Sequence, residues 1–199
     1  MPRSIGFRFA VVVAFLAATL PARADPCTGD GHTRPAPTTE TLRNVRAAIR
    51  EYDFRRALIM LREAAAGGSA AAETELGLFY WEGRGGLEPD EREAVRLVRL
   101  AADRGYARAQ FKLGVFDALG LGGLTKDDGA AAGLYILAAA QGDADAEEFL
   151  GVYYENGRGV AKDTARALKW YRKAAAQGCF FARDDVKRLL QKRRHAGRI

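Results

Sequence analysis

One interval of 37 residues organises most of this chain. Leucine-glycine pairs and Gly-x-Gly turns both recur at that interval, at Leu76-Gly77, Leu113-Gly114 and Leu150-Gly151 and at Gly83/Gly85, Gly120/Gly122 and Gly157/Gly159. An aspartate recurs four times, followed by alanine four residues later and glycine fifteen residues later, at Asp53, Asp90, Asp127 and Asp163. So many positions in step predict an array of structural repeats.

Each period contains two amphipathic helical patterns. In the last period the first pattern places apolar residues at i, i+4, i+7 and i+8, and the second nearly repeats that spacing, with Ala146, Leu150, Tyr153 and Tyr154 followed by Ala167, Trp170, Tyr171, Ala174 and Ala175. One such helix pair cannot bury both apolar faces alone. The sequence therefore predicts an all-α solenoid, in which neighbouring helix pairs bury each other.

The repeat from Ala146 to Gly178 carries the pattern A-x-x-x-L-G-x-x-Y-x-x-G-x-G-V-x-x-D-x-x-x-A-x-x-W-Y-x-x-A-A-x-x-G. This pattern resembles the Sel-one-like repeat (SLR), a relative of the tetratricopeptide repeat, over roughly residues 53–190. The other two repeats match less closely, because Asp117 replaces a tyrosine and each has one extra turn residue, Gly86 and Gly123. The resemblance implies a right-handed superhelix that binds proteins, and it implies no catalytic residue.

Divergent half-repeats are expected at both ends of the array. Residues 39–68 form one at the N-terminal end, where Thr38 or Thr39 caps the first helix. At the other end a last first-type helix carries Lys187 where the repeats have glycine, which suits a cap with a polar outer face. We therefore expect a solenoid domain over residues 40–191, with about three full two-helix repeats, and a basic tail over residues 192–199.

Glycine lies inside a predicted helix in each repeat, at Gly77, Gly114 and Gly151. Glycine there costs about 1 kcal/mol relative to alanine. Because this cost recurs in three repeats, we predict that the missing side chain lets the partner helix approach closely.

Residues 1–24 have the features of a secretory signal peptide. Arg3 and Arg8 precede an apolar run from Phe9 to Leu20, and Ala22-Arg23-Ala24 offers a cleavage site after Ala24. The apolar run is shorter than the roughly 20 residues of a membrane span, although a retained anchor is the alternative. Residues 25–39 are rich in Pro, Gly and Thr and are expected to form a flexible arm. We expect an exported, periplasmic protein.

The positive charge is concentrated at the two ends of the chain. Removing residues 1–24 removes three arginines and no acid, so the formal charge falls from +6 to +3. From Arg183 onward seven Lys or Arg stand against two Asp, which leaves the remainder near −2. A basic stripe across the body, as expected of a nucleic-acid binder, is therefore not predicted. Membrane association is expected only through the basic tail.

The two cysteines, Cys27 and Cys179, lie in the arm and at the end of the last repeat. An exported pair can form a disulfide. The twelve residues between Cys27 and Thr39 reach at most roughly 40 Å, which permits the bridge without requiring it. Free thiols and an intermolecular pair are the alternatives.

The chain offers no catalytic or metal-binding constellation by sequence. Its two histidines, His32 and His195, lie in the arm and the tail, and its only serine after residue 24 is Ser69. The adjacent Glu147 and Glu148 diverge on a helix and are expected to face solvent. We predict no cofactor and no enzyme activity. A secreted hydrolase or β-lactam-binding protein of the SLR type is the alternative.

The positions that differ among repeats are the candidate partner contacts. Trp81 aligns with Ala118 and Glu155, and Asp117 aligns with tyrosines. Trp81, Asp117 and Glu155 are therefore predicted to lie near one groove, although Trp81 can equally pack on a neighbouring loop and Asp117 can be a tolerated departure. The expected function is an adaptor that binds another protein of the cell envelope.

Overall fold

The computed structural model of the chain describes residues 40–196, and in that range every regular element is a helix. The expected signal peptide (1–24) and arm (25–39) lie outside the described residues. The elements are α2 (Glu40–Arg50), α3 (Phe54–Ala66), α4 (Ala70–Glu82), η1 (Arg84–Gly86), α5 (Glu91–Asp103), α6 (Ala107–Leu119), η2 (Leu121–Gly123), α7 (Asp128–Ala140), α8 (Ala144–Asn156), α9 (Thr164–Ala176) and α10 (Phe180–Ala196).

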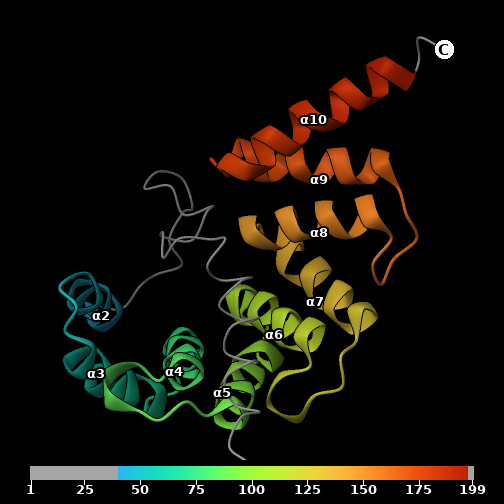
Figure 1. Cartoon of the computed structure of the whole chain (residues 1–199). Helices are drawn as coiled ribbons and strands as arrows, with labels where there is room; N and C mark the ends of the chain where they lie inside the picture. The colour runs from blue at the N-terminus through green and yellow to red at the C-terminus, as the bar shows by residue number, and fades with distance from the viewer. Residues whose placement is uncertain (1–39, 197–199) are drawn as a thin grey trace, which may run out of the picture.

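The helices stack into a curved solenoid, which confirms the predicted fold class. Three two-helix repeats, α4–α5, α6–α7 and α8–α9, lie between α2–α3 at one end and α10 at the other. Figure 1 shows α4, α6 and α8 on the inner side of the arc and α3, α5 and α7 on the outer side. We call α4, α6 and α8 the first helices and α3, α5, α7 and α9 the second helices. No helix between residues 40 and 196 is long and apolar enough to cross a bilayer.

The recurring aspartates are the N-caps of all four second helices. Each carboxylate accepts a hydrogen bond from a backbone N–H in the first turn, with Asp53, Asp90, Asp127 and Asp163 in turn capping α3, α5, α7 and α9. A cap of this kind contributes typically about 1 kcal/mol. The aspartates thus set where each second helix begins.

The core contains both small and large residues from both helices of each repeat. The alanine four residues after each cap has no exposed surface, at Ala57, Ala94, Ala131 and Ala167. Facing the second helices, the first helices bury Phe79, Phe116 and Tyr153 at equivalent positions. The small side chains let the helices approach closely, and the large ones fill the space between repeats.

The helical glycines are the points of closest approach within each repeat, as predicted. A Cβ added at Gly77 would lie 2.8 Å from Val98 Cγ2 of α5. At Gly114 and Gly151 it would lie 2.7 and 2.5 Å from the rings of Tyr135 and Tyr171. Real Cβ atoms are not found at such distances, so each first helix can pack this way only without a side chain at this position.

The last helix covers the end of the stack. Lys187 occupies the position equivalent to Gly151, is exposed, and forms an ion pair with Asp184 on its own helix. The expected polar outer face of the cap is therefore present. Helix α10 continues to Ala196, five residues beyond the expected boundary at 191. Lysine and arginine in the last turns of a helix interact favourably with its C-terminal dipole.

We expect Gly151→Ala to lower the melting temperature although alanine is the better helix former. The new methyl group meets the Tyr171 ring, and such overpacking costs roughly 1–3 kcal/mol. Gly133→Ala on α7 is the matched control, because nothing lies within 4 Å of its added Cβ. That variant should gain up to about 1 kcal/mol. Thermal melts of both variants decide the point, and a stabilised Gly151→Ala would contradict the packing argument.

Candidate partner-binding surface

The first helices share a partly buried apolar position. On each first helix the residue directly after the interhelical glycine is only partly buried and apolar, at Leu78, Val115 and Val152. These three residues, the concave row, lie on α4, α6 and α8, the inner helices of the arc in Figure 1. Successive packed helices lie roughly 10 Å apart, so the row extends over about 20 Å.

An aromatic side chain marks the row's C-terminal part. Phe149 lies three residues before Val152, on the same face of α8, and is 37% exposed. Its ring packs edge-on against Phe111, with 5.2 Å between centroids, and lies 5.5 Å from the ring of Tyr135. The orientation of Phe149 is therefore set before any partner arrives, which lowers the entropy lost on binding.

Trp81 packs toward the next repeat. It is half-buried, and its ring meets that of Phe116 edge-on at 5.6 Å between centroids. Trp81 also packs against the buried cluster that contains Val98, Leu113 and Phe116. The ring contact of Trp81 is thus with helix α6 of the next repeat, and packing on a neighbouring loop stays a prediction. Its role in partner binding stays a prediction.

Asp117 lies beside the turn that leads into α7. Its backbone carbonyl accepts a hydrogen bond from the N–H of Asp127 at 3.0 Å. Tyr80 and Tyr154 accept the equivalent bond from the aspartate caps of their own repeats, each at 2.8 Å. Burial raises the pKa of the Asp117 carboxyl, and nearby Arg99 opposes that shift. Aspartate thus replaces tyrosine without changing the backbone connection.

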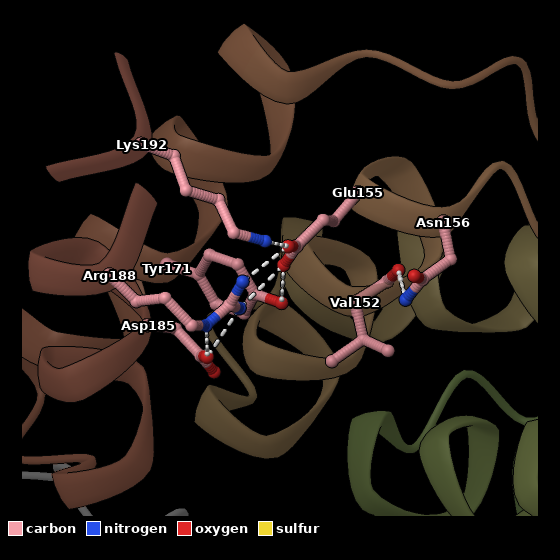
Figure 2. A network of polar contacts seen from close by, with 7 residues as sticks. All are labelled: Val152, Glu155, Asn156, Tyr171, Asp185, Arg188 and Lys192. Atoms are coloured by element: carbon pink, nitrogen blue, oxygen red, sulfur yellow. Dashed lines mark hydrogen bonds and ion pairs between the residues drawn. The ribbon is translucent and has the colours of Figure 1, made fainter. Parts of the chain in front are cut away.

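Glu155 faces the cap helix rather than the inner surface. Its carboxylate pairs with both terminal nitrogens of Arg188, accepts a hydrogen bond from the Tyr171 hydroxyl at 3.1 Å and lies 3.6 Å from Lys192 Nζ (Figure 2). Arg188 also bonds Asp185 at 2.6 Å. The hydrogen bond from Arg188 is the main cause that lowers the pKa of Glu155. This network fastens α10 to the last repeat.

Two of the three predicted contact residues, Trp81 and Glu155, make contacts within the stack, and their role in binding a partner stays a prediction. Trp81 and Glu155 occupy equivalent positions, and both point toward the following helix layer, where Trp81 meets α6 and Glu155 meets α10. The partly buried apolar residues of the concave row were not singled out from sequence. Their signal was available, because Leu78, Val115 and Val152 recur at the 37-residue interval directly after the glycines.

A buried polar contact also repeats in every unit. The fourth residue of each first helix is buried and bonds a residue just after the second helix of the same repeat. Glu73 pairs with Arg104, Gln141 Nε2 donates to Gln110 at 2.8 Å, and Gln177 Nε2 donates to Glu147 at 2.8 Å. The expectation that Glu147 faces solvent is wrong, because this contact holds it at 4% exposure.

Glu148, its neighbour, is also largely removed from solvent. Burial, with smaller contributions from Asp145 and Asp185, raises the pKa of Glu148 to about 7. Its Oε2 lies 2.9 Å from the Sγ of Cys179, a side chain with no exposed surface. Cys27 lies outside the described residues, so the Cys27–Cys179 disulfide stays a prediction. Among residues 40–196 no cluster of three His, Cys, Asp or Glu side chains could hold a metal ion.

Removing the Glu155–Arg188 contact should loosen the cap without disturbing the repeats. We expect Glu155→Gln to lower the free energy of unfolding by about 1 kcal/mol, the upper end for a partly exposed pair. Backbone amides of α10 should exchange with deuterium faster, while those of α4 and α5 are unchanged. Asp184→Asn, which removes the exposed pair with Lys187 on the same helix, is the control and should change little. Equal exchange in both variants would show that Glu155 does not fasten α10.

Glu148 should make stability fall as the pH rises. The folded protein keeps the Glu148 proton until its pKa of about 7, whereas the unfolded chain releases it near 4.5. Between these values the unfolded state binds fewer protons, so stability decreases with increasing pH. We expect Glu148→Gln to match the wild type near pH 4.5 and to exceed it by about 1–2 kcal/mol at pH 8. Urea unfolding across this range measures the difference, and a pH-independent difference would refute the assignment.

Comparison with known proteins identifies the repeat. The family model described as "Sel1 repeat" matches residues 48–69, 70–106, 107–143 and 144–179. The last three matches coincide with α4–α5, α6–α7 and α8–α9, and the first covers the end of α2 and all of α3. A search of the curated proteins returned no match.

Two solved structures share this architecture at about the same identity. A Sel1 repeat protein from Oxalobacter formigenes is 30% identical, with a TM-score of 0.67, over 75% of this chain and 59% of its own. The protective antigen c5321 of uropathogenic Escherichia coli, which has an SLR fold, is 31% identical with a TM-score of 0.63. That match covers 73% of this chain and 32% of the antigen. This chain thus spans less than two thirds of either relative, and it belongs to the Sel1 repeat family.

Proposed function

We propose that this protein is an exported scaffold that holds a segment of another cell-envelope protein against its concave row. Sel1 repeat proteins are generally scaffolds for protein–protein interaction and are typically non-catalytic. The observation that carries the proposal is the concave row itself. Leu78, Val115 and Val152 are apolar in all three repeats although no helix covers them fully.

The size and chemistry of the row favour a short apolar segment. An extended chain rises about 3.3 Å per residue, so roughly six residues span the 20 Å of the row. Apolar side chains of that segment would contact Leu78, Val115 and Val152 in turn. Phe149 offers an oriented ring at one end, and aromatic anchors of this kind commonly dominate interface energies.

The proposal of export rests on the sequence. A basic start, an apolar run from Phe9 to Leu20 and the Ala22-Arg23-Ala24 site together have the order of a signal peptide. The partner would then be another protein of the same compartment. N-terminal sequencing of the protein recovered from the periplasm tests this part directly, and a mature chain beginning at Asp25 is expected.

Site-specific photocrosslinking tests the binding surface. A benzophenone amino acid placed at Val115 or Val152 should give adducts of higher mass in living cells, because both positions face the proposed partner. Ile136, on the outer helix α7 and 40% exposed, is the matched control and should give none. A lysine at Val152 should remove the adducts formed from Val115, since a charge on the row must be desolvated.

Two outcomes would refute this function. The first is an absence of adducts from both inner positions, and the second is equal labelling from Ile136. Val152→Lys must keep its helical circular dichroism and melting temperature for the result to count, which its partial exposure allows.

A further inference from the structure

The outer face of α9 carries a groove that the concave row does not reach. The groove follows α9 over the twelve residues from Ala165 to Ala176 and is bordered on one side by Arg193 of α10. We call it the α9 groove. It is lined by Ala165, Leu168, Lys169, Arg172, Lys173, Ala176 and Arg193. At 1.5 Å per residue, the lined part of α9 is about 16 Å long.

The α9 groove is strongly cationic. Four of its seven lining residues are lysine or arginine, and none is acidic. Helices α3, α5 and α7 each contain at least one Asp or Glu, whereas α9 contains none. The expectation that the body has no basic stripe is therefore wrong at this helix, because total charge does not report how charges are distributed.

Within residues 40–196, little of this charge is neutralised. Lys173 lies 3.9 Å from Glu147 and above the ring of Trp170. Lys169, Arg172 and Arg193 have no acidic partner among residues 40–196. Like charges three and four residues apart on a helix oppose helix formation by a few tenths of a kcal/mol each. A bound anion would remove this repulsion.

The α9 groove lies on the last second helix, where no further repeat packs. On α3 and α5 the turn of the following repeat covers the fifth residue after the cap. Gly85 packs against Leu58 in this way, and Gly122 against Val95. Leu168 is the equivalent residue of α9, and it is equally buried, at 3% exposure, although no repeat follows it. Arg193, near the C-terminal end of α10, lines the same groove as Leu168.

The shape of the groove selects among anionic ligands. A single phosphate would contact one or two cations and leave the apolar floor of Ala165, Leu168 and Ala176 uncovered. A flat bilayer meets protruding apolar groups, whereas here the apolar residues form the floor between longer cationic side chains. An elongated ligand with both acidic and apolar groups fits the length, the rim and the floor together.

A second copy of this chain is a poor occupant. Head-to-tail stacking would bring the α2–α3 end of one molecule to the α9 groove of the next. That end is itself basic, with Arg43, Arg46, Arg50, Arg55, Arg56 and Arg62 against Glu40, Glu51, Asp53 and Glu63. Repulsion between the two ends disfavours such a fibre.

We propose that the α9 groove binds an acidic segment of a partner protein. The carboxylates of that segment would pair with Lys169, Arg172 and Arg193. Its apolar side chains would contact Ala165 and Ala176, which are exposed on either side of the buried Leu168. The inference rests on the proposed function in one respect, that the chain is a scaffold for proteins. It adds a second surface, on α9, whose ligand carries acidic groups in addition to apolar ones.

Fluorescence anisotropy with a defined peptide tests this site. The probe is a labelled peptide of about 12 residues, three helical turns, that carries glutamates with leucine at every third or fourth position. We expect the double variant Lys169→Glu/Arg172→Glu to weaken binding at least tenfold. Arg55→Glu/Arg56→Glu makes the same charge change on α3 and should change affinity less than twofold. A peptide with serine for leucine should also bind about tenfold more weakly.

Every other pattern counts against the groove. Equal weakening by the two double variants would mean general charge attraction only. Sedimentation with phosphatidylglycerol vesicles that is lost only in Lys169→Glu/Arg172→Glu would assign the surface to membranes instead. Val152→Lys should leave peptide binding unchanged. If the peptide does not bind the wild-type protein but Val115 still forms crosslinks, only this inference is refuted. If the peptide binds but Val115 forms no crosslinks, only the proposed function is refuted.

Discussion

The contact on which this structure depends is the close approach of two helices where one of them has no side chain. At Gly77, Gly114 and Gly151 the facing second helix comes so near that even a methyl group has no room. Each repeat is held together by this contact, and stacking then buries the large side chains between repeats. The cost of glycine in a helix is offset by the packing that its absence of a Cβ allows.

The same contact explains what sequence reasoning could predict. The glycines, the capping aspartates and the buried alanines recur at a fixed interval, because every repeat solves one packing problem in one way. Helix order, capping and the polar cap at Lys187 followed from that interval. The end of α10 did not, because the extra turns depend on contacts such as Arg188 with Glu155 that join segments far apart in sequence.

The candidate binding surfaces were harder to predict for a physical reason. Trp81 and Glu155 attracted attention because they differ from their counterparts, yet each serves a contact that exists only at its own place in the stack. The concave row is conspicuous only once the curvature is known, because an apolar residue in a helix ordinarily indicates core. The net charge of the chain did not predict the α9 groove, because the acidic residues of α4 and α8 offset the basic residues of α9.

The contacts between repeats also determine the order in which repeats can be joined. Trp81 meets Phe116 at the first junction, Arg108 pairs with Asp145 at the second, and Glu155 pairs with Arg188 at the third. A permuted chain would place tryptophan against the cap's arginine and bury an aspartate without its arginine. Three repeats with the same helix pair are thus joined through chemically different contacts. The order of the repeats along the chain is therefore specified by the side chains at their junctions, and not by the helix pair that all repeats share.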